Sequence, residues 1–338
     1  MSERIRGQIW RDGHKVDGFD LSKISDCPDD PDLLVWADLE CPTHETMTAL
    51  ADELDLDPFA VEDTTSAAER VKTVAYAHHT FLMVYAVTEK QPDDGGTGDP
   101  SPSQKANAFE LHRISVFVKD NALITVRRTS GFDIDTVVQR WADIGGEQYG
   151  IGALLHGLLD VVVDGHFDAV QQLDDAIEGL ESMLFDEKVA ARALQRQTYD
   201  LRKDLVVLRR VVLPMREVIG GIQRRRFDNH APPELDPHFS DLYDHALRAA
   251  EWTESLRDMV TTVFETNLSL ADARLNTVMK KLTGWAAIIA VPTAITGWYG
   301  QNVPFPGFSQ PIGFATSTVL IVVLVAALYV SFRRRDWL

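Results

Sequence analysis

The sequence predicts an α+β domain followed by long helices, the last of which continues into a two-helix transmembrane hairpin. Three observations support this fold class. Strand-like segments are confined to the first 130 residues, helical periodicity fills the middle of the chain, and the only two long apolar segments lie in about the last sixty residues. With 338 residues, 45% of them hydrophobic, the chain can bury a sizeable core in one large or two smaller domains.

Residues 1–130 are predicted to form a cytosolic α/β domain. The segments rich in β-branched and aromatic residues are Leu33–Glu40, Val74–Glu89 and Arg113–Arg128. Asp120 and Asn121 mark a hairpin turn inside the last of these, and Thr43–Leu56 has helical periodicity. The segment Gln91–Lys105 has too few apolar residues to order itself, so we expect a loop within a hairpin.

Residues 131–236 are predicted to form long cytosolic helices, because strand patterns disappear after Asp133. Two amphipathic segments, Ile151–Phe185 and Lys188–Gln223, are separated by a short break. The proline-containing segment Arg224–Pro237 ends the second one. A stalk helix over 237–281 follows, and no breaker interrupts it before Gly284, so it can run directly into the first apolar segment.

The two apolar segments have the length of membrane spans. Residues 282–300 and 312–332 contain 19 and 21 uncharged residues, and a bilayer core needs about 20 helical residues. Lys280 and Lys281 precede the first segment, an uncharged outer loop over 301–311 joins the two, and a basic tail over 333–338 follows the second. Since positive residues stay inside, we expect a multi-pass protein of the cell inner (plasma) membrane with both termini in the cytoplasm.

Charge and cysteine content exclude several classes of protein. The net charge of −18 and the pI near 4.9 argue against nucleic acid as a partner, because phosphate binding needs a basic face. An acidic surface either attracts cations or simply keeps the protein soluble. Two cysteines, Cys27 and Cys41, are too few for a disulfide framework or a structural zinc site. The charged N-terminus lacks the apolar core of a signal peptide.

A stripe of small and polar residues follows one face of the helix predicted to enter the membrane. Its members recur at spacings of three or four, and we call them the pore stripe: Asn276, Met279, Leu282, Ala286, Ala290, Thr293 and Gly297. Gly300 continues the stripe into the loop. Such a stripe serves either helix packing, because small residues let membrane helices approach, or the lining of a pore.

The loop after the stripe carries neither acid nor base. Asn302 offers an amide and Gly300 ends the helix, so the loop has neutral oxygens without a fixed charge. Mg²⁺ loses its water reluctantly, and neutral oxygens that hydrogen-bond the hydration shell suit it better than carboxylates that strip it. The alternative is that Gly300 and Asn302 only cap the helix and turn the chain.

The four residues Tyr299 to Asn302, Tyr-Gly-Gln-Asn, resemble the Tyr-Gly-Met-Asn signature of CorA-type divalent cation channels. Further segments resemble the same family: Pro58–Lys72, Ser240–Asp258, Ala273–Thr283 and Phe332–Leu338. The resemblance implies a homopentamer in the lipid bilayer, with an αβα-type cytosolic funnel on long stalk helices. Five first membrane helices would line the pore and five second helices would face lipid.

The resemblance also assigns residues to the ion pathway. It implies a selectivity filter at Tyr299, Gly300, Gln301 and Asn302. It implies pore positions at Asn276, Met279, Leu282 and Thr293, which are members of the pore stripe. Met279 and Leu282 match a hydrophobic constriction, which can gate by dewetting.

A cytosolic cation sensor is the other implication of the resemblance. In the family an acidic pair across the subunit interface binds Mg²⁺, and the motifs place this pair at Asp63 and Asp241, with Glu62 as a possible third ligand. Two carboxylates about 4 Å apart repel each other by roughly 1 to 4 kcal/mol, and a divalent ion reverses the sign. Mg²⁺ would then be both the transported and the regulatory ion, and no organic cofactor is expected.

The expected function is influx of hydrated divalent cations, with Mg²⁺ first and Co²⁺ or Ni²⁺ also possible, gated by cytosolic divalent cation. Gln301 stands where the family usually has Met, and ZntB-like zinc transporters also vary this position, so zinc transport stays open. A membrane-anchored sensor or scaffold without flux is a further alternative. An enzyme is not expected, because no nucleophile, base and oxyanion donors occur at recognisable spacing.

Overall fold

The computed structural model describes residues 3–12, 14–16, 18–19, 24, 33–67, 69–90, 108–186, 191–224, 232–301, 304 and 306–338. The chain divides into two compact units, Met1–Val263 and Phe264–Leu338, and the boundary falls inside one long helix. The predicted loop Gln91–Lys105, the cysteine at 27 and the amide at 302 lie outside the described residues.

The first unit is built on one mixed sheet of seven strands, in the order β2-β1-β3-β7-β6-β5-β4. The strands are β1 (Arg4–Arg11), β2 (His14–Val16), β3 (Leu33–Glu40), β4 (Lys72–Ala75), β5 (Thr80–Glu89), β6 (Phe109–Val118) and β7 (Ala122–Arg127). Neighbouring strands are antiparallel except β3 and β7, which run parallel with Val35 opposite Ala122. This parallel pair joins the N-terminal strands to the β4–β7 meander.

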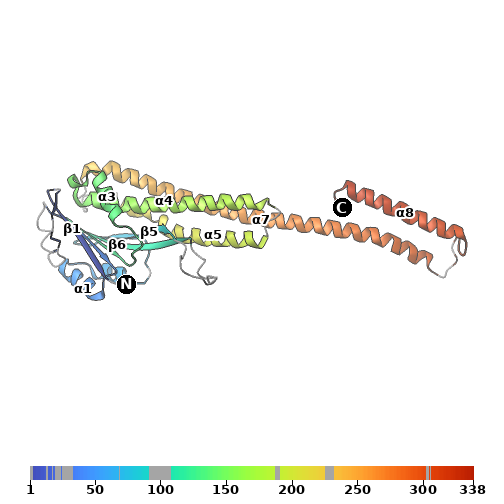
Figure 1. Ribbon diagram of the computed structural model, residues 1–338, viewed down its shortest axis with the longest axis horizontal. Helices are drawn as coiled ribbons and strands as arrows, with labels where there is room; N and C mark the ends of the chain where they lie inside the picture. The colour runs from blue at the N-terminus through green and yellow to red at the C-terminus, as the bar shows by residue number, and fades with distance from the viewer. Residues whose placement is uncertain are drawn as a thin grey trace. The chain divides into compact units, whose positions relative to one another are not determined.

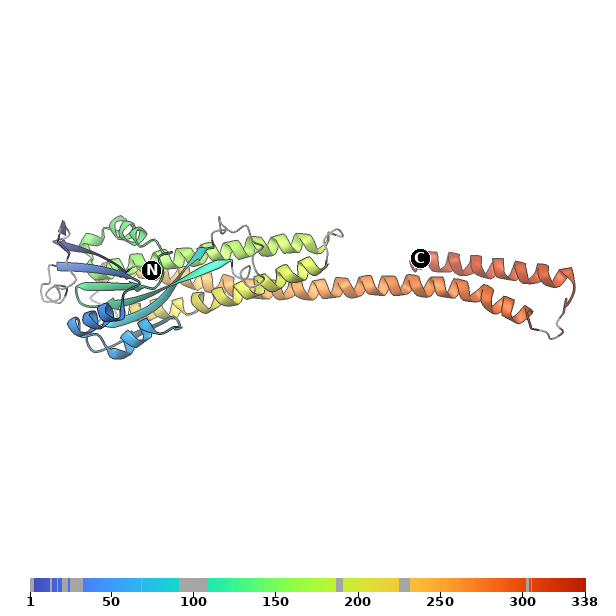
Figure 2. The ribbon, with the colours of Figure 1, turned by 60° about the horizontal axis from the view of Figure 1, so that its bottom comes forward.

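Helices cover both faces of the sheet, so the first unit is an α/β/α sandwich (Figures 1 and 2). On one face, α1 (His44–Glu53) and α2 (Pro58–Thr65) pack over a core that includes Leu39, Phe81 and Phe117. The long helix α4 (Gly150–Leu184) lies on the other face against β5 and β7. It comes close to the sheet at Gly165, where an added Cβ would lie 3.0 Å from the carbonyl oxygen of Val87.

The remaining helices of the first unit extend the layer of α4. They are α3 (Asp135–Asp143), α5 (Ala191–Val212), α6 (Met215–Arg224) and the first part of α7 (Asp236–Tyr299). Aromatic contacts of Phe167 with His245 and Trp252 join α4 to α7, and an ion pair between Arg209 and Glu254 joins α5 to α7. The buried side chains of α7 up to Val263 make this part of the helix a member of the sandwich.

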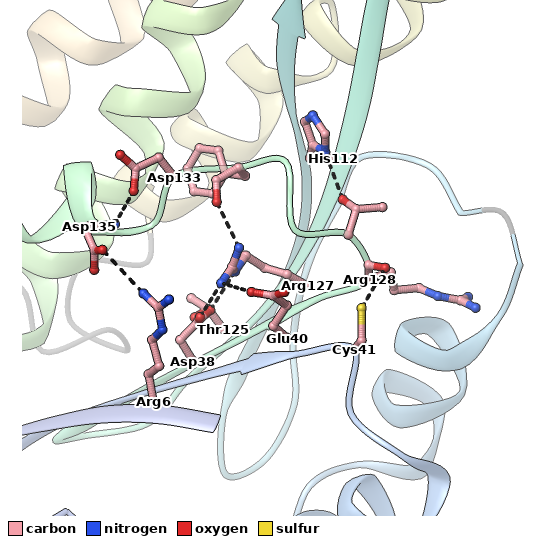
Figure 3. Close-up of polar contacts among 12 residues, drawn as sticks. Arg6, Asp38, Glu40, Cys41, His112, Thr125, Arg127, Arg128, Asp133 and Asp135 are labelled. Carbon is pink, nitrogen blue, oxygen red and sulfur yellow. Dashed lines mark hydrogen bonds and ion pairs between the residues drawn. The ribbon is translucent and has the colours of Figure 1, made fainter. Parts of the chain in front are cut away.

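A charged network is buried within the sheet, on strands β3 and β7 (Figure 3). Arg127 donates to both carboxylate oxygens of Asp38, from Nε at 3.0 Å and from Nη2 at 2.6 Å, and Nη2 also lies 3.2 Å from Glu40. The three side chains are at most 9% exposed. Burial works to lower the pKa of Arg127, but the hydrogen bonds and charges of Asp38 and Glu40 outweigh it and raise the pKa.

The second unit consists of the end of α7 and helix α8 (Pro311–Arg334), which form a helical hairpin. An added Cβ at Gly284 would lie 3.3 Å from Leu338 and 3.8 Å from Phe332, and Ile288 is 8% exposed. Gly284 and Ile288 are four residues apart and therefore share one face of α7. The C-terminal end of α8 and the tail pack on this face.

Several element predictions are confirmed. Leu33–Glu40 is strand β3, Thr43–Leu56 contains helix α1 with Thr43 as its N-cap, and Asp120 and Asn121 lie in the turn between β6 and β7. The helix that starts at Asp236 continues to Tyr299 without interruption, as the absence of a breaker before Gly284 predicts. A mixed sheet between two helical layers agrees with the α+β class and with the αβα type implied by the resemblance.

Other element predictions are wrong. The segment Val74–Glu89 is two strands, β4 and β5, because the chain turns where the Tyr76 amide bonds the His79 carbonyl at 2.9 Å. The predicted helix Lys188–Gln223 is divided into α5 and α6 next to Pro214, which cannot donate a helical hydrogen bond. Strands β1 and β2 were not expected, since their charged residues hide the alternation that their pairing with β3 requires. Helices α2 and α3 were not expected either.

Candidate ion pathway and cation sensor

Three of the described helices are long and apolar enough to cross a membrane, by length and composition. They are α4, the helical segment Pro233–Tyr299 that contains α7, and α8. In α4, 67% of the most apolar 18-residue segment is buried within the protein. In the segment that contains α7 the buried share is 11%, and in α8 it is 6%. The apolar surface of α4 is therefore used in the core of the first unit. That of the last part of α7 and of α8 is left for lipid or for other copies of the chain.

All seven residues of the pore stripe, from Asn276 to Gly297, are exposed along α7. At about 100° per residue, Ala286, Ala290 and Thr293 lie roughly opposite Gly284 and Ile288, which pack against α8 and the tail. The helical hairpin of the second unit thus covers one face of α7 and leaves the stripe uncovered. A surface that α8 does not cover is available to neighbouring copies or to water.

Polar atoms are few on the uncovered face, and their hydrogen bonds are local. The Thr293 hydroxyl donates to the Ile289 carbonyl at 3.0 Å, which leaves its oxygen lone pairs directed away from the helix backbone. Pro292 has no N–H, so the carbonyl of Ile288 lacks its usual helical donor. The Thr296 hydroxyl donates to the Pro292 carbonyl at 2.9 Å. The stripe therefore presents neutral oxygens and no charge within this part of α7.

Helix α7 ends at Tyr299, next to the predicted selectivity filter. The Gly300 amide donates to the Thr296 carbonyl at 2.8 Å, and a Cβ on Gly300 would lie 2.9 Å from the same oxygen. No other residue fits this approach without a shift of the backbone. Gln301 is exposed, and its backbone N–H donates to the Trp298 carbonyl at 3.3 Å. Asn302, the residue on which the filter prediction depends most, lies outside the described residues.

The predicted sensor residues Glu62 and Asp63 lie on α2, in the first unit. Asp57 caps this helix by accepting from the Phe59 amide at 2.9 Å, and Pro58 starts it. Glu62 is exposed. The carboxylate of Asp63 is 20% exposed and has Lys72 of strand β4 as its partner, with Nζ 2.7 Å from Oδ2.

Lys72 was not identified from the sequence as a partner of Asp63, although it follows Asp63 by nine residues. Its ammonium also donates to Glu69 at 3.1 Å, which lowers the pKa of Glu69. Burial works to lower the pKa of Lys72 itself, but the hydrogen bonds to Asp63 and Glu69 outweigh burial and raise it. The ammonium of Lys72 is therefore already paired with the carboxylate of Asp63, which the resemblance assigns to a metal ion.

Asp241, the other sensor residue, lies near the start of α7 and is 71% exposed. The Nε2 atom of His245, one helical turn further on, lies 3.8 Å from its Oδ2 atom. Within one chain the two sensor residues thus have different neighbours, Lys72 for Asp63 and His245 for Asp241. Among the residues that the structure describes, no group of three or more His, Cys, Asp or Glu converges to hold a metal ion.

Comparison with known proteins gives the same family from sequence and from fold. A family profile described as "CorA-like Mg2+ transporter protein" matches residues 32–334. The chain is 27% identical over 288 residues to the cobalt/magnesium transport protein CorA of Thermotoga maritima, covering 83% of this chain and 76% of that protein. It is 28% identical over 238 residues to the zinc transport protein ZntB of Yersinia enterocolitica, covering 69% and 70%.

Solved structures share the architecture over almost the whole chain. The complete structure of the CorA magnesium transporter from Methanocaldococcus jannaschii aligns with a TM-score of 0.72 and 22% identity, covering 98% of both chains. The ZntB cytoplasmic domain from Vibrio parahaemolyticus aligns with a TM-score of 0.53 and 11% identity, covering 71% of this chain and 88% of that one. At these identities the likeness shows the fold alone. The profile match, however, extends over both units, and the chain therefore belongs to the CorA-like Mg²⁺ transporter protein family, a family of divalent cation transporters rather than enzymes.

Proposed function

We propose that this chain is the subunit of a homopentameric channel that lets hydrated divalent cations, first of all Mg²⁺, enter the cytosol. The observation that carries the proposal is the uncovered pore stripe, which lies opposite the face of α7 that packs on α8. Several copies that turn this face toward a common axis would enclose a conduit lined by small, neutral groups. Apolar side chains of α8, such as Val322 at 62% exposure, would meet lipid.

The outer mouth would select the ion through the segment Tyr299 to Asn302. A ring of neutral amides and carbonyls hydrogen-bonds a hydration shell without removing it, which suits an ion that dehydrates as reluctantly as Mg²⁺. The membrane potential is a sufficient driving force. A divalent ion gains about 4.6 kcal/mol in 100 mV, which supports import against a concentration ratio of about a thousandfold.

Closure would occur at Met279 and Leu282. Both side chains are apolar and are 51% and 63% exposed in the single chain, so they have no partner within the second unit that fills their space. A ring of such side chains from several copies makes a narrow apolar segment, and water leaves such a segment readily.

The sensor would consist of Asp63 from one copy and Asp241 from the next, with Glu62 nearby. Carboxylate oxygens are the ligands that Mg²⁺ prefers, and the high exposure of Asp241 leaves it available to a neighbour. Bound cytosolic Mg²⁺ would hold the copies together in the closed state, and its loss would leave repelling carboxylates. The protein would lie in the plasma membrane with both termini in the cytosol.

Zinc transport is the second candidate for the ion, because relatives named zinc transport protein ZntB match at the same level of identity as the CorA relatives. Purified protein in liposomes, tested for uptake of Mg²⁺, Zn²⁺, Co²⁺ and Ni²⁺ with and without a pH gradient, decides between them. We expect Mg²⁺ uptake without a pH gradient. Uptake of Zn²⁺ alone, or only with a proton gradient, would replace the Mg²⁺ proposal by the zinc one.

The same assay tests the filter and the alternative of a scaffold without flux. Asn302→Ala should abolish uptake, and Gln310→Ala, a change in the same loop at the residue before α8, should preserve it. Absence of flux for every ion in the unchanged protein would leave the membrane-anchored sensor or scaffold as the remaining interpretation.

A further inference from the structure

A cavity of about 490 Å³ lies between strand β4 and helix α6. Strand β4 is the last strand on its side of the sheet and pairs only with β5, so its other edge faces the cavity side without a strand partner. Both elements belong to the first unit. The cavity has the size of a site for a small organic ligand.

The side chains that line the cavity are mostly cationic, whereas the chain as a whole is acidic. Three cationic side chains, Arg70, Lys72 and Arg224, line it, together with a single carboxylate, Glu217. The chain as a whole carries a net charge of −18. Within the part of the chain that the structure describes, neither Arg70 nor Arg224 forms an ion pair. Arg70 and Arg224 thus line one cavity, and neither is paired with a carboxylate among the described residues.

Two glycines of α6 let this arrangement form. A Cβ on Gly221 would lie 3.0 Å from the Thr73 methyl carbon, so glycine allows α6 to approach β4 closely. A Cβ on Gly220 would lie 3.3 Å from Nη1 of Arg224, which places this guanidinium directly over the glycine. The position of Arg224 is therefore fixed in part by the absence of a side chain beneath it.

Three residues of the lining, Val71, Pro214 and Val218, form an apolar wall. Val71 and Val218 are buried at 5% and 2% exposure, and Pro214 completes this wall. Guanidinium groups bind phosphate oxygens in pairs, with a geometry that a lone ammonium does not offer. A ligand that carries phosphate at one end and a less polar group at the other matches both parts of the lining, and the volume exceeds what orthophosphate needs.

We propose that this cavity is a binding site for a phosphate-bearing anion larger than orthophosphate, held by Arg70 and Arg224 against the apolar wall of Val71, Pro214 and Val218. The shared chemistry is the phosphate group, and its source is either a nucleotide or a free polyphosphate. The cavity shares Lys72 with the ion pair of Asp63, but the proposed binding does not depend on which cation the protein transports.

Isothermal titration of the full chain in detergent, with EDTA present to remove divalent cations, tests the proposal. The probes are ATP, pyrophosphate and adenosine. We expect binding of ATP, of pyrophosphate or of both, and none of adenosine. Preference for ATP assigns the source to nucleotides, and equal binding of the two assigns it to polyphosphate. Binding of neither anion, or binding of adenosine as strong as that of ATP, overturns the proposal.

Variants locate the binding in the cavity. Arg70→Ala and Arg224→Ala should each weaken binding about tenfold or more, since each removes a charge-assisted hydrogen bond from an exposed side chain. Glu217→Gln removes the one repelling carboxylate and should tighten binding by about twofold to fivefold, an effect that misfolding cannot imitate. Arg216→Ala, an exposed arginine of the same helix that does not line the cavity, is the control. Equal affinity of the unchanged protein and the Arg70→Ala/Arg224→Ala double variant contradicts the assignment.

Discussion

The ammonium of Lys72 lies 2.7 Å from the carboxylate of Asp63, and the two side chains are 19% and 20% exposed. An ion pair this sheltered is screened less by salt than a surface pair. Since Asp63 is also the residue proposed to take a cytosolic cation, a metal ion has to compete with a resident ammonium. If Asp63 is part of the proposed sensor, Lys72 raises the concentration of divalent cation needed to occupy it.

Lys72→Met should increase the apparent affinity of the sensor for Mg²⁺ about fivefold, because a competitor worth roughly 1 kcal/mol is removed. The measurement is the Mg²⁺ concentration that protects the full chain in detergent from trypsin, which does not depend on transport. Lys203→Met, an exposed lysine on α5, serves as the control. An unchanged or higher protective concentration in Lys72→Met would show that the ammonium does not compete.

Asp63→Ala and Asp241→Ala should each blunt inhibition by cytosolic Mg²⁺. Each change removes a carboxylate whose interaction with a divalent ion is worth about 1 kcal/mol or more, so half-inhibition should shift upward on the order of tenfold. Inside-out patches with stepped internal Mg²⁺ measure the shift. Glu251→Ala changes an exposed acid further along α7 and should leave the inhibition as it is. Full block at millimolar Mg²⁺ in both variants would refute the sensor assignment.

Arg127→Met should destabilise the first unit by about 3 to 5 kcal/mol, because it leaves Asp38 and Glu40 buried without a counter-charge. Arg6→Met breaks an ion pair with Asp135 whose side chains are 50% and 67% exposed, and this change should cost less than about 1 kcal/mol. Both pairs are visible in Figure 3. Urea denaturation followed by tryptophan fluorescence compares the two variants, and similar losses would contradict the buried network.

Stability should fall below neutral pH through His166 on α4. This imidazole is 1% exposed, its Nε2 donates to the Tyr85 carbonyl at 2.8 Å, and burial lowers its pKa to about 4. Because the folded pKa lies below the ordinary value near 6.5, the contribution to stability is complete above pH 6.5. It is lost as the pH falls toward 4, by about 3 kcal/mol in all.

His166→Gln keeps a donor near the Nε2 position and cannot titrate, so its stability should depend less steeply on pH in this range. Thermal melting of the full chain at half-unit steps between pH 7 and pH 4 measures the slope. Parallel curves for the variant and the unchanged protein would mean that other groups cause the acid sensitivity.

Local patterns explain which parts of the fold the sequence predicted. Strand β3 and the β6–β7 hairpin are rich in β-branched and aromatic residues and have turn residues between β6 and β7, so the sequence shows where they lie, although β6 begins four residues earlier than predicted. The pairing of β1 with β3 depends on contacts between segments far apart in the sequence, which composition does not report, and the turn from Tyr76 to His79 lacks glycine and proline and so has no strong turn signal. The same holds for the Lys72 partner of Asp63, since no local period relates residues on a helix and on the following strand.

The ion pathway was predictable in part for a similar reason. The spacing of the pore stripe is a property of one helix, and the structure leaves all of its members exposed on one side of α7. The filter and the sensor depend on neighbours from other copies and on Asn302, so a single chain does not establish them. They remain predictions.

The most direct test of a water-filled pathway along the pore stripe compares two cysteines in a background with Cys27 and Cys41 replaced by serine. Thr293→Cys lies in the stripe, and Val291→Cys lies toward the face that packs on α8. The measurement is Mg²⁺ uptake into liposomes before and after a charged, water-soluble methanethiosulfonate. We predict that the reagent blocks uptake through Thr293→Cys and leaves Val291→Cys unaffected. Block of both variants alike, or continued uptake after Thr293→Cys has been fully modified, would contradict a pore on this face of α7.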